Sequence, residues 1–438
     1  MKRLISALTF LCLALPAWAA VEIEEVTTPS GFKIWLVEDH SIPFTALELR
    51  FRGGTSLDAP GKAGSVNLMT GLLEEGAGDL DARGFARSLE GLAAQFSYGA
   101  NDDDVSVSAR FLTDNRDAAV DLLRLSLTQP RFDADAVERV RRQVLSGLRS
   151  DASDPNDIAR ETLATLAYGD HPYAIPDSGT LESVAALTQE DLRAAHKAVF
   201  ARDRVFIGAV GDITAAQVSA LIETLLADLP EAGAPQPGPA QVQIPQGGVT
   251  VVPFETPQSV ALFAHAGIER DHPDFFPAFV LNHILGGGGF ESRLMSEVRE
   301  KRGLTYGVYS YLLSKDHAAL YLGSVSSANS RIAEAVEVIR SEWSDMATQG
   351  VTEAELAAAQ TYLTGAYPLR FDGNGPIATI MVGMQMQGLT TDYIATRNDK
   401  VNAVTLADIS RVAAKVLKPD ALHFVIVGQP EGLPVPTE

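Results

Sequence analysis

The stretch SEVREKRGLTYGVYSYLL, residues 296–313, holds the side chains best suited to chemistry. The candidates Arg299, Arg302, Tyr306, Tyr309 and Tyr311 fall within one predicted helix-to-strand junction, and four consecutive glycines, residues 286–289, stand just upstream. An arginine and several tyrosines brought together in one junction are side chains that could do chemistry. From the pattern alone we prefer a simpler interpretation, in which a basic helix end is followed by an amphipathic strand of tyrosines.

Other kinds of reactive site find little support in the sequence. No two of the eight histidines are closer than seven residues, so the H-x-x-x-H pair that places two imidazoles on one helix face is absent. There is no G-x-S-x-G nucleophile motif. The segment GGGGFESR lacks the third glycine of a dinucleotide-binding loop, so its glycines predict a flexible or closely approached loop.

The elements that must position Arg299 and Tyr306 are a helix and a strand. We expect the helix to end near Arg299 and the strand to begin near Leu304, which places Tyr306 and Val308 on one strand face. On the other strand face we expect Tyr309 and Tyr311. The apolar residues at helical spacing predict the buried stripe of the helix, which consists of Phe290, Leu294 and Val298.

An internal repeat organises the chain. Residues 184–211 and 401–428 align without a gap, with identities that include Thr188/Thr405, Asp191/Asp408 and Gly211/Gly428. Each copy begins with a Thr and an Asp at capping-box spacing, continues as an amphipathic helix, and ends in an apolar strand that stops at glycine. We conclude that the chain is a duplication.

The repeat and the order of elements predict an α+β fold with two homologous halves, each a mostly antiparallel sheet with helices packed on one face. The predicted domains are residues 20–229 and 247–430. Residues 230–246, rich in Pro, Gly and Ala, predict a linker, and residues 431–438 a tail.

The first residues predict a secretory signal, residues 1–19. Lys2 and Arg3 precede an apolar run from Leu4 to Leu15, and residues 17–19 form an A-x-A cleavage site. We therefore expect export to the bacterial periplasm and no membrane span. The only cysteine, Cys12, lies in the segment to be removed. A formal net charge of −21 argues against nucleic acid as a partner.

The stretch LGGGGFESRLMSEVREKRGLTYGVYSYL, residues 285–312, resembles the second-half signature of the pitrilysin/insulinase family of zinc peptidases (peptidase family M16). TQEDL before a helix and a strand ending in VGD extend the resemblance to most of the chain. The resemblance implies that the Tyr306 hydroxyl donates to the scissile carbonyl as it becomes an oxyanion, and that Arg299 holds substrate backbone carbonyls. We also assign substrate binding to the glycine run, Gly286, Gly287, Gly288 and Gly289.

The first half departs from this family at the zinc site. The family carries H-x-x-E-H on a helix, with a third ligand, a glutamate, about 76 residues later. Here GSVNLMTGLLEEG, residues 64–76, stands in that place, with Asn67 and Gly71 at the histidine positions and Thr70 at the general base. The third ligand position falls near Gly147. Adjacent Glu74 and Glu75 point about 100° apart on a helix and would make a poor substitute.

These observations predict a chain that binds no zinc and has no autonomous peptidase activity. We expect a non-catalytic, substrate-binding subunit of a heterodimeric zinc peptidase, whose partner carries H-x-x-E-H and the zinc. In this hypothesis Arg299 and Tyr306 act in trans on a peptide or an unfolded segment. The alternative is a peptide-binding or structural scaffold protein with no catalytic role.

Overall fold

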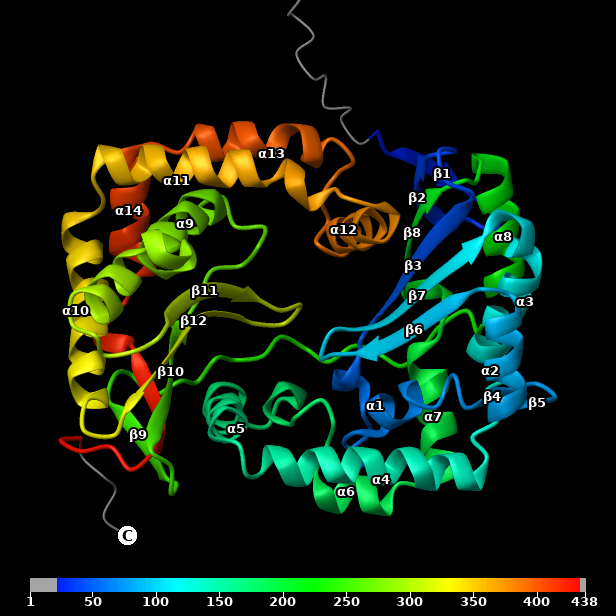
Figure 1. Cartoon of the computed structure of the whole chain (residues 1–438), viewed down its shortest axis with the longest axis horizontal. Coiled ribbons are helices and arrows are strands. Elements are labelled where there is room, and N and C mark those ends of the chain that lie inside the picture. Colours follow the sequence, from blue (N-terminus) through cyan, green and yellow to red (C-terminus); the bar gives the residue numbers. More distant parts are fainter. Residues whose placement is uncertain (1–21, 434–438) are drawn as a thin grey trace, which may run out of the picture.

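The computed structural model describes residues 22–433, which form two sheets with helices around them (Figure 1). The predicted signal, Cys12 and residues 434–438 lie outside the described residues.

The first half is built on a six-stranded sheet in the order β1-β2-β8-β3-β7-β6, in which only β2 and β8 run parallel. Its strands are β1 (Glu24–Thr27), β2 (Lys33–Glu38), β3 (Phe44–Arg52), β6 (Gln95–Ala100), β7 (Asp104–Leu112) and β8 (Val205–Gly211). A separate small ribbon consists of β4 (Gly76–Ala77) and β5 (Leu80–Asp81). Its helices are α1 (Ser65–Thr70), α2 (Ala82–Gly91), α3 (Arg116–Thr128), α4 (Ala134–Asp151), α5 (Pro155–Tyr168), α6 (Leu181–Ala186), α7 (Gln189–Val199) and α8 (Ala215–Leu226).

The second half repeats this plan with a five-stranded sheet in the order β11-β12-β10-β13-β9, in which only β13 and β9 run parallel. Its strands are β9 (Val249–Pro253), β10 (Gln258–Ala266), β11 (Val308–Ser314), β12 (Ala319–Ala328) and β13 (His423–Gly428). Its helices are α9 (Phe275–Asn282), α10 (Ile332–Gln349), α11 (Glu353–Ala366), α12 (Asn374–Met386), α13 (Tyr393–Asn402) and α14 (Leu406–Val416). The predicted fold class, α+β with two homologous halves, is confirmed.

The repeated segment folds the same way in both halves. Thr188 and Thr405 each cap a helix, α7 and α14, and each forms a complete capping box with the Asp three residues later. The following strands, β8 and β13, end at Gly211 and Gly428, whose φ angles are +127° and +151°. A Cβ at Gly211 would lie 2.2 Å from the carbonyl oxygen of Phe44. Glycine therefore stands at these strand ends because the neighbouring strand passes too close for a side chain.

Each sheet buries one face against helices of its own half. In the first half the inward residues of β3, such as Leu47 and Leu49, pack with Leu122 of α3 and Leu192 of α7. In the second half, residues of β10 and β13 pack with α10 and α14, around Trp343.

The other face of each sheet is covered by a helix from the opposite half. Helix α12 lies on β3 and β8 of the first sheet, where Met381 packs with Trp35 and Ala46. Helix α5 lies on β10 and β13 of the second sheet, where Leu163 packs with Val425. The sequence predicted helices on one face only, so this exchange of α5 and α12 is an addition to the predicted fold (Figure 1).

The halves also meet where two hairpin turns touch. The turn between β11 and β12 reaches the turn between β6 and β7, where Lys315 pairs with Asp102 and the backbone N–H of Asp316 donates to Asp103 over 3.1 Å. The Tyr173 hydroxyl also donates to Asp103. The Arg52 guanidinium lies 2.8 Å from the Asp316 carboxylate. We call this cluster the hairpin junction.

The segment predicted as a linker, residues 230–246, contains no helix or strand and runs across both halves. Its Ala240 N–H donates to the carbonyl of His317 over 2.9 Å, and its Gln243 N–H donates to Ala167 over 2.9 Å. Among residues 22–433, no helix combines the length and the apolar composition needed to cross a bilayer.

Candidate functional site

The glycine run follows α9 through a π-helical turn, His283–Gly287, and comes into close contact with its surroundings. A Cβ at Gly286 would lie 2.4 Å from the Ser310 hydroxyl, and one at Gly288 would lie 2.8 Å from the His283 carbonyl. Only Gly289, with φ +57°, faces open space. Gly286 therefore lets the backbone pack against β11, whereas Gly287 and Gly288 pack against Asn282 and His283 of the preceding turn, in agreement with a closely approached loop.

The predicted buried stripe is only partly correct. Leu294 and Val298 are buried, but Phe290 is 61% exposed. Phe290 lies in a separate 3₁₀ turn, Gly289–Glu291, and the extended backbone of Ser292 breaks the register before the next helical segment. That segment, Met295–Glu300, is π-helical, so the α-helical spacing used for the prediction does not apply to it.

Arg299 differs from the other basic residues around it. Arg293 pairs with Glu355, and both Lys301 and Arg302 pair with Glu297. Arg299 has no acidic partner among the described residues, and its guanidinium lies 4.5 Å from the centre of the Phe290 ring. This contact keeps the flat face of the guanidinium on an aromatic ring and leaves its N–H edge available.

Tyr306 lies in the loop before β11, because that strand begins at Val308 rather than near Leu304 as expected. Thr305 holds this loop: its hydroxyl lies 2.7 Å from the carbonyl of Ser326 on β12 and accepts the Gly307 N–H over 3.0 Å. The Tyr306 side chain is 86% exposed. It is thus a phenol presented to solvent on a loop whose backbone is fixed.

The positions that correspond to zinc ligands lie on and after α1. Asn67 and Thr70 are on this short helix, which ends at Gly71, and the Thr70 hydroxyl donates to the Val66 carbonyl over 2.8 Å. Gly147 lies on the exposed side of α4. Two of the four positions therefore have no side chain, and a third is committed to a backbone bond. This donor set does not fit zinc.

The neighbouring carboxylates do not replace it. Glu75 pairs with Arg139 of α4. Within residues 22–433, no three His, Cys, Asp or Glu side chains lie close enough together to hold a metal ion.

The structure places the predicted residues in two separate regions. Arg299, Tyr306 and the glycine run belong to the second half, whereas α1 belongs to the first. No hydrogen bond or ion pair of the described residues joins Arg299 or Tyr306 to the α1 positions.

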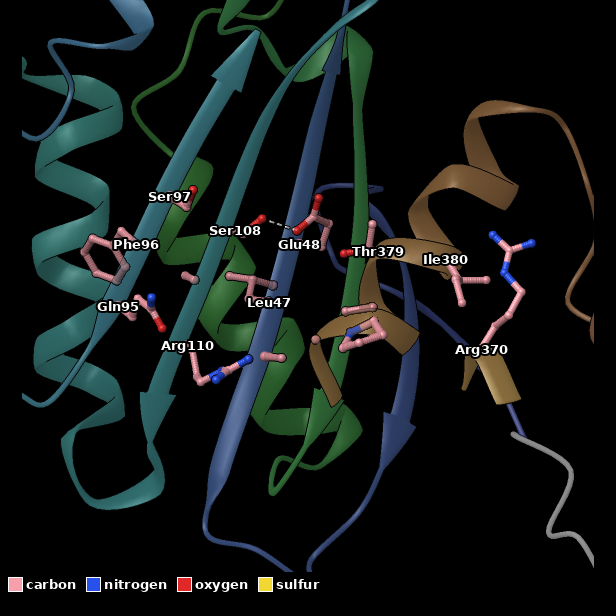
Figure 2. Close-up of a pocket in the computed structure, with 15 residues that line it drawn as sticks. Leu47, Glu48, Gln95, Phe96, Ser97, Ser108, Arg110, Arg370, Thr379 and Ile380 are labelled. Carbon is pink, nitrogen blue, oxygen red and sulfur yellow. Dashed lines mark hydrogen bonds between the residues drawn. The ribbon is translucent and has the colours of Figure 1, made fainter. Parts of the chain in front are cut away.

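A cavity of about 640 Å³ lies between α12 and the first sheet (Figure 2). Helix α12 covers β3 and β8, and the sheet face beyond it carries Ser97 of β6 and Ser108 and Arg110 of β7. Buried Glu48 accepts hydrogen bonds from Ser108 and from Arg50. Strand β6 is one of the two edge strands of the sheet, with β1 at the other edge. We call this region the β6 groove.

Three residues of these regions support the site although the sequence predicted no functional role for them. Phe290 supports Arg299, Thr305 fixes the Tyr306 loop, and Ser108 belongs to the polar wall of the β6 groove. A signal was present for the last, because Ser and Val alternate along residues 105–108 and indicate one polar strand face.

The chain matches two family descriptions in sequence. Residues 33–180 match "Insulinase (Peptidase family M16)" and residues 186–363 match "Peptidase M16 inactive domain".

Known proteins resemble the chain over nearly its whole length. The crystal structure of a peptidase M16 inactive domain from Pseudomonas fluorescens is 30% identical, with a TM-score of 0.87 over 95% of this chain and 100% of the other. A Helicobacter pylori protein named "Non-peptidase homolog YmxG" is 27% identical over 429 residues, 97% of this chain and 98% of its own. A Helicobacter pylori protease structure, 17% identical, shares the fold with a TM-score of 0.83 over 93% of this chain and 99% of the other. From these matches, the chain belongs to the M16 (insulinase) peptidase family.

Proposed function

We propose that this chain is the non-catalytic, substrate-binding subunit of a heterodimeric zinc peptidase of the periplasm. Its partner carries H-x-x-E-H and the zinc ion. This chain contributes Arg299 and Tyr306, which reach a peptide held at the partner's metal. The substrates are peptides or unfolded segments.

The observation that carries this proposal is the contrast between the two regions. The α1 positions have lost every zinc donor, whereas Tyr306 is 86% exposed on a fixed loop and Arg299 has no acidic partner among the described residues. An exposed phenol and an unpaired guanidinium can stabilise an oxyanion and hold substrate carbonyls. Both groups are available to a second chain.

The β6 groove supports the peptide part of the proposal. A free edge strand offers backbone N–H and C=O groups to an extended peptide, which would add to the sheet as a further strand. The serine-bearing face beside that edge can accept or donate hydrogen bonds to side chains of such a peptide.

The test is an assay on quenched fluorogenic peptides with this chain, with a homologue that bears H-x-x-E-H, and with both. We expect activity only in the mixture. Tyr306→Phe should lower it by about 10²–10³, the usual effect of losing one oxyanion donor. Tyr309→Phe, another exposed tyrosine of the same segment, is the matched control and should keep full activity. Equal activity of the two variants would contradict the proposal.

The alternative function, a peptide-binding scaffold with no catalytic role, is favoured by the name of the Helicobacter pylori relative, a non-peptidase homologue. It predicts peptide binding by this chain alone and no activity in any mixture. In that case Tyr306→Phe and Tyr309→Phe would change only peptide affinity.

A further inference from the structure

A second cavity, of about 360 Å³, also borders α12. Its walls come from the loop before α9, from α9, from the end of α11, and from α12 and α13. Its aromatic members are Phe275, Phe276, Phe279, Tyr367 and Tyr393. Its charged members are Arg270, Arg370 and Arg397. No Asp or Glu lines it. We call it the arginine pocket.

None of the three arginines forms an ion pair among the described residues. Arg397 is only 6% exposed, and its bonds are to neutral groups, the Leu363 carbonyl at 2.7 Å and Asn398 at 3.1 Å. Arg270 donates to the Tyr393 hydroxyl over 2.8 Å. Arg270 also lines a neighbouring recess together with the adjacent acids at positions 269 and 271, but it forms no ion pair with them. In a chain of net charge −21, three unpaired guanidiniums around one cavity form an unsatisfied positive site.

The three charges converge. Burial, with support from Tyr393, raises the pKa of the Tyr367 hydroxyl to about 12, and the guanidiniums of Arg397, Arg370 and Arg270 all oppose this rise. Burial lowers the pKa of Arg397, because no carboxylate compensates its charge. An anion placed among these groups would relieve that cost.

The aromatic walls orient two of the arginines. The Arg270 guanidinium lies 4.2 Å from the Phe275 ring centre, and that of Arg397 lies 4.4 Å from the Tyr367 ring centre. Stacking fixes each guanidinium plane and leaves unused N–H groups at its edge, the geometry that holds a carboxylate. The same rings form an apolar wall for a side chain attached to that carboxylate.

The arginine pocket connects with the β6 groove. Arg370, Thr379 and Ile380 line both cavities. Figure 2 shows Arg370 beside Ile380, at the end of the groove away from Phe96 of β6. A chain that lies along the groove can therefore reach the arginines with one end.

We propose that the arginine pocket binds the terminal carboxylate of a peptide whose last residue is apolar or aromatic. The proposal rests on the peptide-binding role proposed above. The volume lies near the lower end of the ~300–1,000 Å³ range of small-ligand sites, which suits one or two residues. A terminal carboxylate brings an apolar side chain beside it, whereas the carboxylate of an Asp or Glu residue does not.

The test measures binding of acetyl-Ala-Ala-Ala-Phe to this chain alone by calorimetry. The acid should bind at least about tenfold more tightly than its C-terminal amide, because hydrogen bonds to a charged group are lost in the amide. Acetyl-Ala-Ala-Ala-Lys should bind more weakly than the Phe peptide, because its ammonium meets three guanidiniums. Equal binding of acid and amide, or inorganic phosphate that binds as tightly as the peptide, would overturn the proposal.

The variant that tests the pocket is Arg370→Gln. Arg370 is exposed and has no partner among the described residues, so this change leaves the packing intact. Arg370→Gln should lower the affinity for the peptide acid by about tenfold and leave the affinity for its amide unchanged. Arg87→Gln on α2 removes the same charge from an exposed site in the first half and is the matched control. An equal effect of both variants would mean that net charge alone is responsible, against the proposal.

This experiment is independent of the peptidase assay. If the mixture of the two chains is active but the peptide acid and its amide bind equally, the proposal for the arginine pocket is wrong and the proposed function stands. If the peptide acid binds selectively but the mixture of the two chains is inactive, the proposal for the arginine pocket stands and the shared active site is wrong.

Discussion

Helices α5 and α12 are counterparts in the two halves, and each borders a cavity, yet the two cavities have opposite charges. The cavity beside α5, about 690 Å³, is lined by six acids, Asp102, Asp151, Asp157, Glu161, Asp177 and Glu182, against Arg160 and Lys315. The arginine pocket beside α12 is lined by three arginines and no acid. The backbone plan of the halves is the same, so the difference lies in the side chains at equivalent places. Duplication has kept the framework and let its surface chemistry diverge.

The largest expected effect tests the shared framework. Ala in place of Gly211 or Gly428 meets a positive φ and an adjacent strand, so each variant should lose about 3 kcal/mol or more of unfolding free energy. Urea unfolding followed by circular dichroism measures both. Gly147→Ala, in an open helical position, should instead stabilise by about 0.5–1 kcal/mol. If only one strand-end variant is unstable, the halves do not share this constraint.

The next effect concerns the acidic cavity and its pH dependence. Burial raises the pKa of Asp102 from 3.8 to about 6, against the pull of Lys315 and with support from Asp177 and Asp103. The folded state therefore binds more protons between these values, and this group's contribution to stability is present below about pH 4 and lost as the pH rises through 6. The wild type should therefore lose about 2–3 kcal/mol of unfolding free energy through Asp102 as the pH rises from about 4 to above 6, and Asp102→Asn should abolish this loss.

Unfolding in urea at pH 4, 5, 6 and 7 measures this change. Asp157→Asn, in the same cavity, is the control, because Asp157 lies on the side of α5 next to Arg160 and outside the hairpin junction. An identical pH profile for wild type and Asp102→Asn would show that the proton is bound elsewhere.

A third prediction gives the arginine pocket the acid that it lacks. Thr379→Glu places a carboxylate on the exposed side of α12, in the cavity lining, where Glu is also a better helix former than Thr. Thr379→Glu should lower the affinity for acetyl-Ala-Ala-Ala-Phe by about tenfold and leave the unfolding midpoint nearly unchanged. Thr379→Gln has a similar size without the charge and should bind as wild type does. Equal affinities of the Glu and Gln variants for the peptide would show that the positive charge of the arginine pocket does not contribute to binding.

The smallest effect compares the two helix caps. Thr188→Ala and Thr405→Ala should each cost about 1 kcal/mol, because both remove an N-cap hydroxyl in a complete capping box. Asp191 keeps its pair with Lys62 at 2.9 Å, whereas Asp408 keeps a longer contact with Arg411 at 3.3 Å. The cost at Thr188 should therefore not exceed that at Thr405. Urea midpoints measured side by side decide this order.

The features that could be predicted from sequence depend on neighbours along the chain. The capping boxes need only residues three apart, and strand ends at glycine follow a local pattern. The fold class followed from the repeat. Phe290 was misplaced because its assignment assumed one continuous α-helix, and the extended Ser292 interrupts that spacing.

The features that could not be predicted depend on contacts between distant segments. An apolar helix such as α12 must be buried, but its sequence does not say which sheet it covers. Arg270, Arg370 and Arg397 come from three different elements, and no spacing signal connects them. The exposure of Tyr306 depends on the hydrogen bond from Thr305 to β12.

The exchange of α5 and α12 has a consequence for synthesis. All strands of the first sheet exist once residue 211 has been made, but the helix that covers its second face ends only at residue 386. Helix α5, in turn, is complete at residue 168, before the first residue of β10, Gln258, has been added. Until the later residues are made, the second face of the first sheet and the apolar side of α5 both stay exposed to solvent. Exposed apolar surfaces of this kind promote misassembly. In a chain that ends before α12, the second face of the first sheet would stay exposed to solvent.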